Sequence, residues 1–177
     1  MTLSTPTSEE ASELTALDPW RWRWLVLVFC VFAADQITKW IVVTELFYGE
    51  RIQVLSFFAL VRWHNSGAAF SFLADAGGWQ RWFFLLIGFA FCAYVMRELS
   101  RLSRAERWMG LVYGLIMGGA LGNLYDRAIE GYVVDFILVH YQQHFFPAFN
   151  VADSALFCGV ALWLVLMIRE SRSTQAN

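Results

Sequence analysis

The sequence predicts an all-α membrane protein with four transmembrane helices and a small β-sheet formed by its outer loops. Of the 177 residues, 58% are hydrophobic and 16% are charged, whereas about 25% of the residues in an ordinary soluble domain are charged. Four apolar segments are each about 20 residues long, which is the length a helix needs to cross a bilayer. Two of the connections between them are rich in Val, Ile, Phe and Tyr, which favour strands.

The four predicted spans are residues 22–43, 80–96, 108–125 and 151–168. Arginines are concentrated before the first span, between the second and third, and after the fourth. Because positively charged loops stay in the cytoplasm, both chain termini are predicted to be cytoplasmic. The strand-like segments 51–65 and 131–141 are then predicted to form a sheet on the outer membrane surface.

The predicted domain organisation is simple. Residues 1–19 are rich in Ser, Thr and Glu and predict a disordered cytoplasmic tail. Residues 20–170 are predicted to form one transmembrane domain, and residues 171–177 a short cytoplasmic tail. A net charge of −2 provides no basic surface for nucleic acid.

The cysteines and histidines do not predict a metal site or a disulfide. Cys30, Cys92 and Cys158 fall in three different apolar segments, which predicts small buried apolar residues. His140 and His144 are four residues apart, but their surroundings are weakly helical and no HExxH motif is present. No metal or cofactor is therefore expected.

Polar side chains converge on the outer side of the membrane once the topology is set. Charges within spanning segments are costly and usually have a function. The residues that the topology brings to this side are Asp35, Lys39, Asn65, Gly67, Asn123, Asp126, Arg127, Asp135, Asn150 and Asp153.

Several of these residues also have purely structural interpretations. Asp35 and Lys39 are spaced i, i+4 and can neutralise each other on one helix face or support a site. Asn150 and Asp153 have the spacing of a capping box at the start of the fourth helix. These alternatives stay open on the sequence alone.

Two further carboxylates also allow more than one interpretation. Asp126 adjoins Arg127, so the two can form a local ion pair at a helix end. Asp135 interrupts the apolar run "VVDFILV" and has no adjacent base. It is either solvated on an exposed strand face or kept for a function.

Taken together, five sequence blocks resemble those of the lipoprotein signal peptidases (signal peptidase II), which are bacterial membrane aspartyl proteases. The blocks occur in the family's order and spacing, and the resemblance covers about residues 22–168. They are "DQITK" (35–39), "NSGAAF" (65–70), "GGALGNLYDR" (118–127), "VVDF" (133–136) and "FNVADSA" (149–155).

The resemblance implies a monomeric inner-membrane enzyme with a periplasmic β-cradle and an active site at the periplasmic face. Its substrates would be prolipoproteins that carry diacylglycerol on a cysteine, and it would cut just before that cysteine in contact with membrane lipids. The resemblance also implies that Asp135 and Asp153 are the catalytic pair. The other outer residues named above would support the site, without a cofactor.

Two other functions are compatible with a polar cluster in a membrane protein. A small ion- or proton-coupled transporter subunit would use Asp35, Lys39 and Asp126 as a relay, but it would need ionisable groups spread through the membrane depth. A non-catalytic scaffold would use the cluster only for helix packing. It predicts that the carboxylates tolerate replacement by amides.

Overall fold

The protein is described here from a computed structural model, which describes residues 19–67 and 78–175. The predicted tail up to residue 18, the last three residues of the "NSGAAF" block and residues 176–177 lie outside the described residues. The four long helices are α2 (Pro19–Glu45), α3 (Trp79–Arg101), α4 (Arg107–Ile129) and α5 (Val151–Gln175). The short 3-10 helix η2 (Arg104–Glu106) connects α3 to α4.

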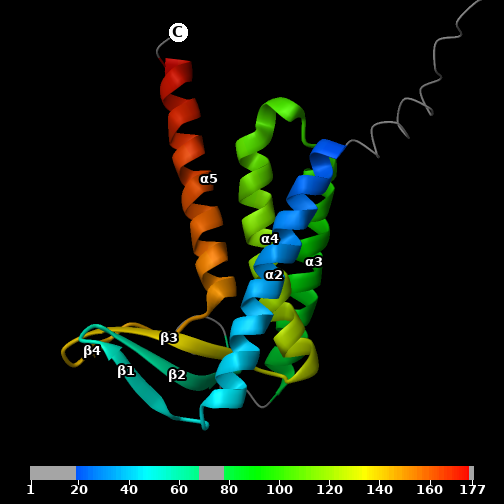
Figure 1. The fold of residues 1–177 in the computed structure, drawn as a ribbon. Coiled ribbons are helices and arrows are strands. Elements are labelled where there is room, and N and C mark those ends of the chain that lie inside the picture. The colour runs from blue at the N-terminus through cyan, green and yellow to red at the C-terminus, as the bar shows by residue number, and fades with distance from the viewer. Residues whose placement is uncertain (1–18, 68–77, 176–177) are drawn as a thin grey trace, which may run out of the picture.

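Three of the four helices, α2, α3 and α5, are long and apolar enough to cross a membrane. The third predicted span, α4, is not one of these three helices, and its sequence includes glycines, tyrosines and Asn123. It contacts each of the other three helices and lies in the middle of the bundle (Figure 1). A helix shielded by its neighbours needs less apolar surface than a helix that faces lipid.

Glycines let the other helices approach α4 closely. Gly110 faces the Trp24 indole of α2, and Gly119 faces the backbone carbonyl of Ala152 in α5. A Cβ atom at Gly119 would also lie 2.9 Å from Cγ of Leu156. Small residues at a helix contact are the usual means of close packing in membranes, and here they bring α5 against the polar end of α4.

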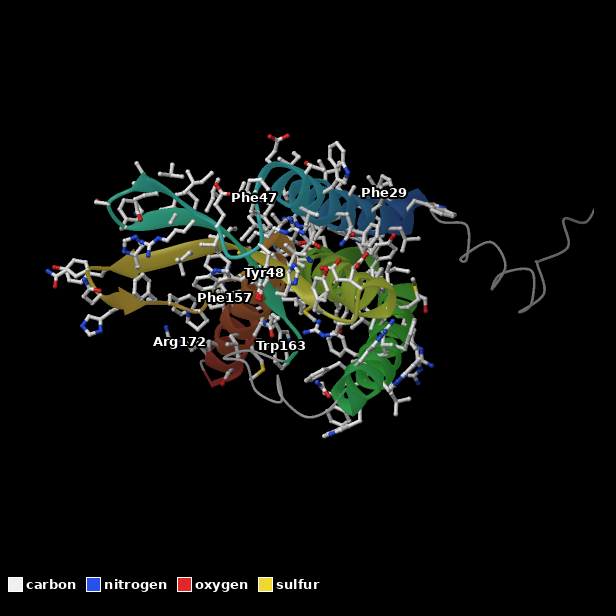
Figure 2. All side chains as sticks on the ribbon, turned by 90° about the horizontal axis from the view of Figure 1, so that it is seen from below. Phe29, Phe47, Tyr48, Phe157, Trp163 and Arg172 are labelled. Carbon is white, nitrogen blue, oxygen red and sulfur yellow. The ribbon has the colours of Figure 1, made fainter. Side chains whose placement is uncertain are left out.

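The sheet lies at the end of the bundle opposite the chain's C-terminus (Figure 1). It is antiparallel, with strands in the order β1 (Arg51–Leu55), β2 (Phe58–Asn65), β3 (Val133–Tyr141) and β4 (His144–Phe145). The predicted strands in segments 51–65 and 131–141 are thus confirmed. Seen along the helices from the sheet end, the sheet extends to one side of the bundle (Figure 2).

The prediction that all three cysteines are buried is wrong for two of them. Cys92 is buried between α3 and α4, but Cys30 and Cys158 are exposed. In a bundle of this kind apolar residues cover the outside of the helices as well as the inside, so an apolar setting does not indicate burial. Helix α5 also runs to Gln175, so residues 171–175 of the predicted C-terminal tail continue that helix.

Candidate active site

Asp135 lies in the middle of β3 and is only 4% exposed. Its carboxylate accepts one hydrogen bond from Asn65 Nδ2 of β2 (3.1 Å) and one from Asn150 Nδ2 (2.8 Å). The alternative that Asp135 is solvated on an exposed strand face is therefore wrong. The carboxylate is thus buried and held by two amide donors, one from β2 and one from the residue just before α5.

Asp153 lies in the first turn of α5, where it completes a capping box with Asn150. Asn150 Oδ1 accepts the backbone N–H of Asp153 (2.9 Å), and Asp153 Oδ2 accepts the backbone N–H of Asn150 (3.2 Å). The capping predicted from the spacing is thus confirmed. The other oxygen, Oδ1, accepts a hydrogen bond from Asn123 Nδ2 of α4 (2.7 Å).

Asn150 connects the two carboxylates. Its side-chain amide donates to Asp135, and its backbone N–H donates to Asp153. Asn150 itself is fully buried, and its amide also lies within hydrogen-bonding distance of Asn123 Oδ1 and the Val134 carbonyl. Asp135 and Asp153 come from separate elements but share this one residue, which fixes their relative position.

A buried ionic cluster lies directly behind this pair. Lys39 Nζ is 2.7 Å from Asp35 Oδ2, 2.7 Å from Asp126 Oδ2 and 3.2 Å from Asn123 Oδ1. The i, i+4 pair of Asp35 and Lys39 on α2 is confirmed, and the ion pair of Lys39 with Asp126 joins α2 to α4. Asp35 Oδ1 also accepts the backbone N–H of Ala152 (2.9 Å), so α2 satisfies an otherwise unpaired N–H group at the start of α5.

The predicted ion pair between Asp126 and Arg127 does not form. Successive residues on a helix point in different directions, and Asp126 points to Lys39. Arg127 instead donates to the backbone carbonyls of Gly67 (2.7 Å) and Asn123 (3.1 Å). The N–H group of Gly67 donates in turn to Asn65 Oδ1 (3.1 Å), so Arg127 and Asn65 together hold the chain just after β2.

The pair faces a cavity of about 650 Å³. Five of the predicted site residues line it: Asn65, Asn123, Arg127, Asp135 and Asp153. Asp35, Lys39, Asp126 and Asn150 lie behind the wall, where they position the residues that do line it. The remaining wall is largely apolar and aromatic; it includes Trp63, Phe146, Phe149 and Phe157.

The environment of Asp135 changes its acidity. Burial, followed by the nearby negative charge of Asp153, raises the pKa of Asp135 to about 7, although the hydrogen bonds from Asn65 and Asn150 act in the opposite direction. A carboxyl group with such a pKa still carries a proton on many molecules at neutral pH. The site therefore combines a carboxylate with a carboxyl group that can donate a proton.

The comparison with known protein families is consistent with this arrangement. The family model for signal peptidase (SPase) II matches residues 27–169. The chain belongs to the signal peptidase II family. The matched region includes every site residue described above, and it covers all four long helices apart from their outermost ends.

Relatives within the signal peptidase II family are similar over most of their length. The lipoprotein signal peptidase of Aeromonas hydrophila is 50% identical over 141 residues, covering 79% of this chain and 84% of the relative. The lipoprotein signal peptidase of Pseudomonas aeruginosa (strain PAO1) is 46% identical over 158 residues, covering 88% of this chain and 94% of the relative.

Two solved structures share the fold. Both are described as bacterial membrane enzymes determined by the in meso method, at 2.3 Å and 1.9 Å resolution. The first has a TM-score of 0.77 at 29% identity, covering 84% of this chain and 89% of the other. The second has a TM-score of 0.71 at 30% identity, covering 82% and 92%.

Sequence reasoning missed two residues at this signal peptidase II site. Gln36 donates to Asp126 Oδ1 (2.8 Å) and so extends the ionic cluster. Because Gln36 is a polar residue next to Asp35 inside a predicted span, the sequence could have indicated that it belongs to the site. Trp63 lines the cavity beside Asp135, but it stood out in the sequence only as one of nine tryptophans.

Proposed function

We propose that this protein removes signal peptides from diacylglyceryl-modified prolipoproteins by cutting just before the lipidated cysteine, with Asp135 and Asp153 as the acid–base pair. The observation that carries the assignment of the pair is that both carboxylates hydrogen-bond to Asn150 and line one cavity. The substrate class is supported by the lipoprotein signal peptidases to which the chain is similar over most of its length.

In the proposed mechanism Asp153 is the general base. Both of its oxygens accept N–H hydrogen bonds, from Asn123 and from the Asn150 backbone, and it lies at the positive end of α5. Asp153 takes a proton from a water molecule, whose oxygen attacks the carbonyl carbon of the scissile bond.

Asp135 is the proposed general acid. Its proton passes to the carbonyl oxygen as the tetrahedral intermediate forms, which limits the build-up of negative charge there. When the intermediate collapses, the C–N bond breaks and the proton held by Asp153 passes to the leaving amine. The proton on the former carbonyl oxygen returns to Asp135, so both carboxyl groups regain their starting states.

The proposed placement in the membrane fits such a substrate. Residues 20–170 form the peptidase domain, α4 crosses the membrane together with α2, α3 and α5, and both termini are on the cytoplasmic side of the bacterial inner membrane. The sheet is then a periplasmic β-cradle. A signal peptide is itself an apolar helix that ends near the outer membrane surface. The carboxyl groups of Asp135 and Asp153, at the outer end of the bundle, can therefore reach the scissile bond while the acyl chains of the substrate stay in lipid. We propose that the protein acts as a monomer.

The transporter alternative is not favoured. Asp35, Lys39 and Asp126 are joined to one another in a single buried cluster, in the halves of α2 and α4 that precede β1 and β3. A relay through the membrane would need such groups at successive depths.

The test is cleavage of a diacylglyceryl-modified prolipoprotein by purified protein in detergent, with EDTA present. Asp135→Asn and Asp153→Asn keep the size of each side chain but remove its acid–base chemistry. Each is expected to lower the cleavage rate by about 10²–10⁴-fold while the protein remains folded. Glu45→Gln, an exposed carboxylate at the end of α2, is the matched control and should cleave normally.

Near-normal cleavage by either aspartate variant would contradict the assignment of the pair. Cleavage by none of the proteins, wild type included, would contradict the proposed substrate class.

A further inference from the structure

The pairing of β2 with β3 contains an irregularity directly beside Asp135. Leu60 pairs with Ile137, but the next pair along is Trp63 with Asp135. Three steps on β2 therefore match two steps on β3, which is a β-bulge with one extra residue on β2. Such bulges re-aim side chains and are frequent next to active sites.

The bulge changes which side chain stands opposite Asp135. With regular pairing after Leu60, Arg62 would lie opposite Asp135. An arginine there would strongly favour the ionised form of the carboxyl group. Because of the bulge, Arg62 turns away and donates to the carbonyls of Val43 (3.0 Å) and Leu46 (2.9 Å) at the end of α2.

Trp63 takes the place opposite Asp135. Directly paired residues of antiparallel strands project from the same face of a sheet, with Cβ atoms about 4.5–5.5 Å apart. Trp63 is thereby brought to the same cavity as the carboxyl group. It is also the one exposed residue of β2, with 38% of its surface accessible.

The exposed indole of Trp63 indicates a place where a ligand can bind. Of the β2 side chains Trp63 is the largest, and a large aromatic surface left open inside a cavity is typical of a ligand contact. Phe157 follows Asp153 by one helical turn on the α5 wall of the same cavity and is 75% exposed. Figure 2 shows it projecting from α5. The two carboxyl groups are thus flanked by one aromatic ring from the sheet and one from the bundle.

The cavity wall formed by the sheet and the cavity wall formed by the helices face different parts of the proposed substrate. In the proposed function the signal peptide lies among the helices, so the chain after the scissile bond leaves towards the sheet, which lies at the end of the bundle opposite the C-terminus (Figure 1). Trp63 belongs to the sheet, next to Asp135. The substrate side chain that passes it comes from the part that is kept after cleavage.

We propose that Trp63 contacts the residue that directly follows the lipidated cysteine and makes the enzyme prefer an apolar side chain there. This inference rests on the proposed function and deepens it. Trp63 is a specificity-determining residue, since it provides contact area and takes no part in the proton transfers.

The test uses three synthetic lipopeptides that are identical except for the residue after the diacylglyceryl cysteine, which is Ser, Leu or Phe. Wild type is expected to have a higher kcat/KM for the Leu and Phe peptides than for the Ser peptide. Trp63→Ala should lower kcat/KM for Leu and Phe by about tenfold, the range for an apolar subsite contact, and for Ser by less than about twofold. Trp63→Phe should stay close to wild type on all three.

Trp40→Ala is the matched control, because Trp40 is an exposed tryptophan on α2 away from the cavity. Melting temperatures of all variants separate a loss of contact from a loss of folding, and Trp63→Leu gives a second apolar replacement if the alanine variant does not fold.

An equal loss on all three peptides, or no loss on any, would overturn the role of Trp63 while leaving the proposed function intact. A wild-type enzyme that cleaves none of the peptides would instead contradict the proposed function itself.

Discussion

At the scale of single residues, the buried site is stable because almost all of its charged groups are paired or hydrogen-bonded. Lys39 lies between Asp35 and Asp126, and every oxygen of Asp135 and Asp153 accepts an N–H group. Buried charges are tolerated only when they are paired or hydrogen-bonded. The exception is Asp135, whose amide donors do not compensate for its burial beside Asp153.

The raised pKa of Asp135 makes the stability of the protein depend on pH. An aspartate in the unfolded chain titrates near 3.9, whereas Asp135 in the folded protein titrates at about 7. Between these values folding takes up a proton, so the free energy of unfolding falls as the pH rises from about 4 to about 7 and then levels off.

Asp135→Asn lacks this dependence. Its melting temperature relative to wild type is therefore expected to be higher at pH 8 than at pH 5, as measured by thermal unfolding in detergent. The same difference at both pH values would show that Asp135 does not titrate in this range.

At the scale of elements, the site exists because α5 starts close against α4. A Cβ atom at Gly119 would meet the carbonyl of Ala152, which is backbone and cannot move aside easily. Gly119→Ala is expected to lower the free energy of unfolding by about 1–3 kcal/mol, the usual cost of overpacking. It should also slow cleavage, because it displaces the first turn of α5, which carries Asp153.

Gly88→Ala is the matched control on α3. A Cβ atom there would meet Cδ1 of Leu124 at 2.6 Å, the end of a flexible side chain that can rotate away. Its loss of stability should be clearly smaller than that of Gly119→Ala, and its cleavage rate close to wild type. Equal losses in the two variants would contradict the role given to the α4–α5 contact.

The elements and contacts that follow from local spacing were predictable from the sequence. The apolar segments predicted the helices, the i, i+4 spacing predicted the pair of Asp35 and Lys39, and the i, i+3 spacing predicted the cap formed by Asn150 and Asp153. The partner of Asp126 was not predictable in this way, because Lys39 comes from another helix. Trp63 was missed since its position depends on a bulge that has no sequence signature here.

At the scale of the whole molecule, the fold brings one residue from each of several elements to one end of the bundle. Helix α2 provides Lys39, α4 provides Asn123, β2 provides Asn65 and β3 provides Asp135. Asn150, at the start of α5, contacts both carboxylates. We therefore expect Asp135 and Asp153 to act as one functional unit rather than as two independent contributors to the rate.

The most direct test of that claim is the cleavage rate of the double variant Asp135→Asn/Asp153→Asn beside the two single variants, on one lipid-modified prolipoprotein. Residues that act as a unit are strongly non-additive. We expect the double variant to cleave no more slowly than the slower of the two single variants. If the two losses multiply in the double variant, the carboxylates act independently and the account of a shared acid–base pair is wrong.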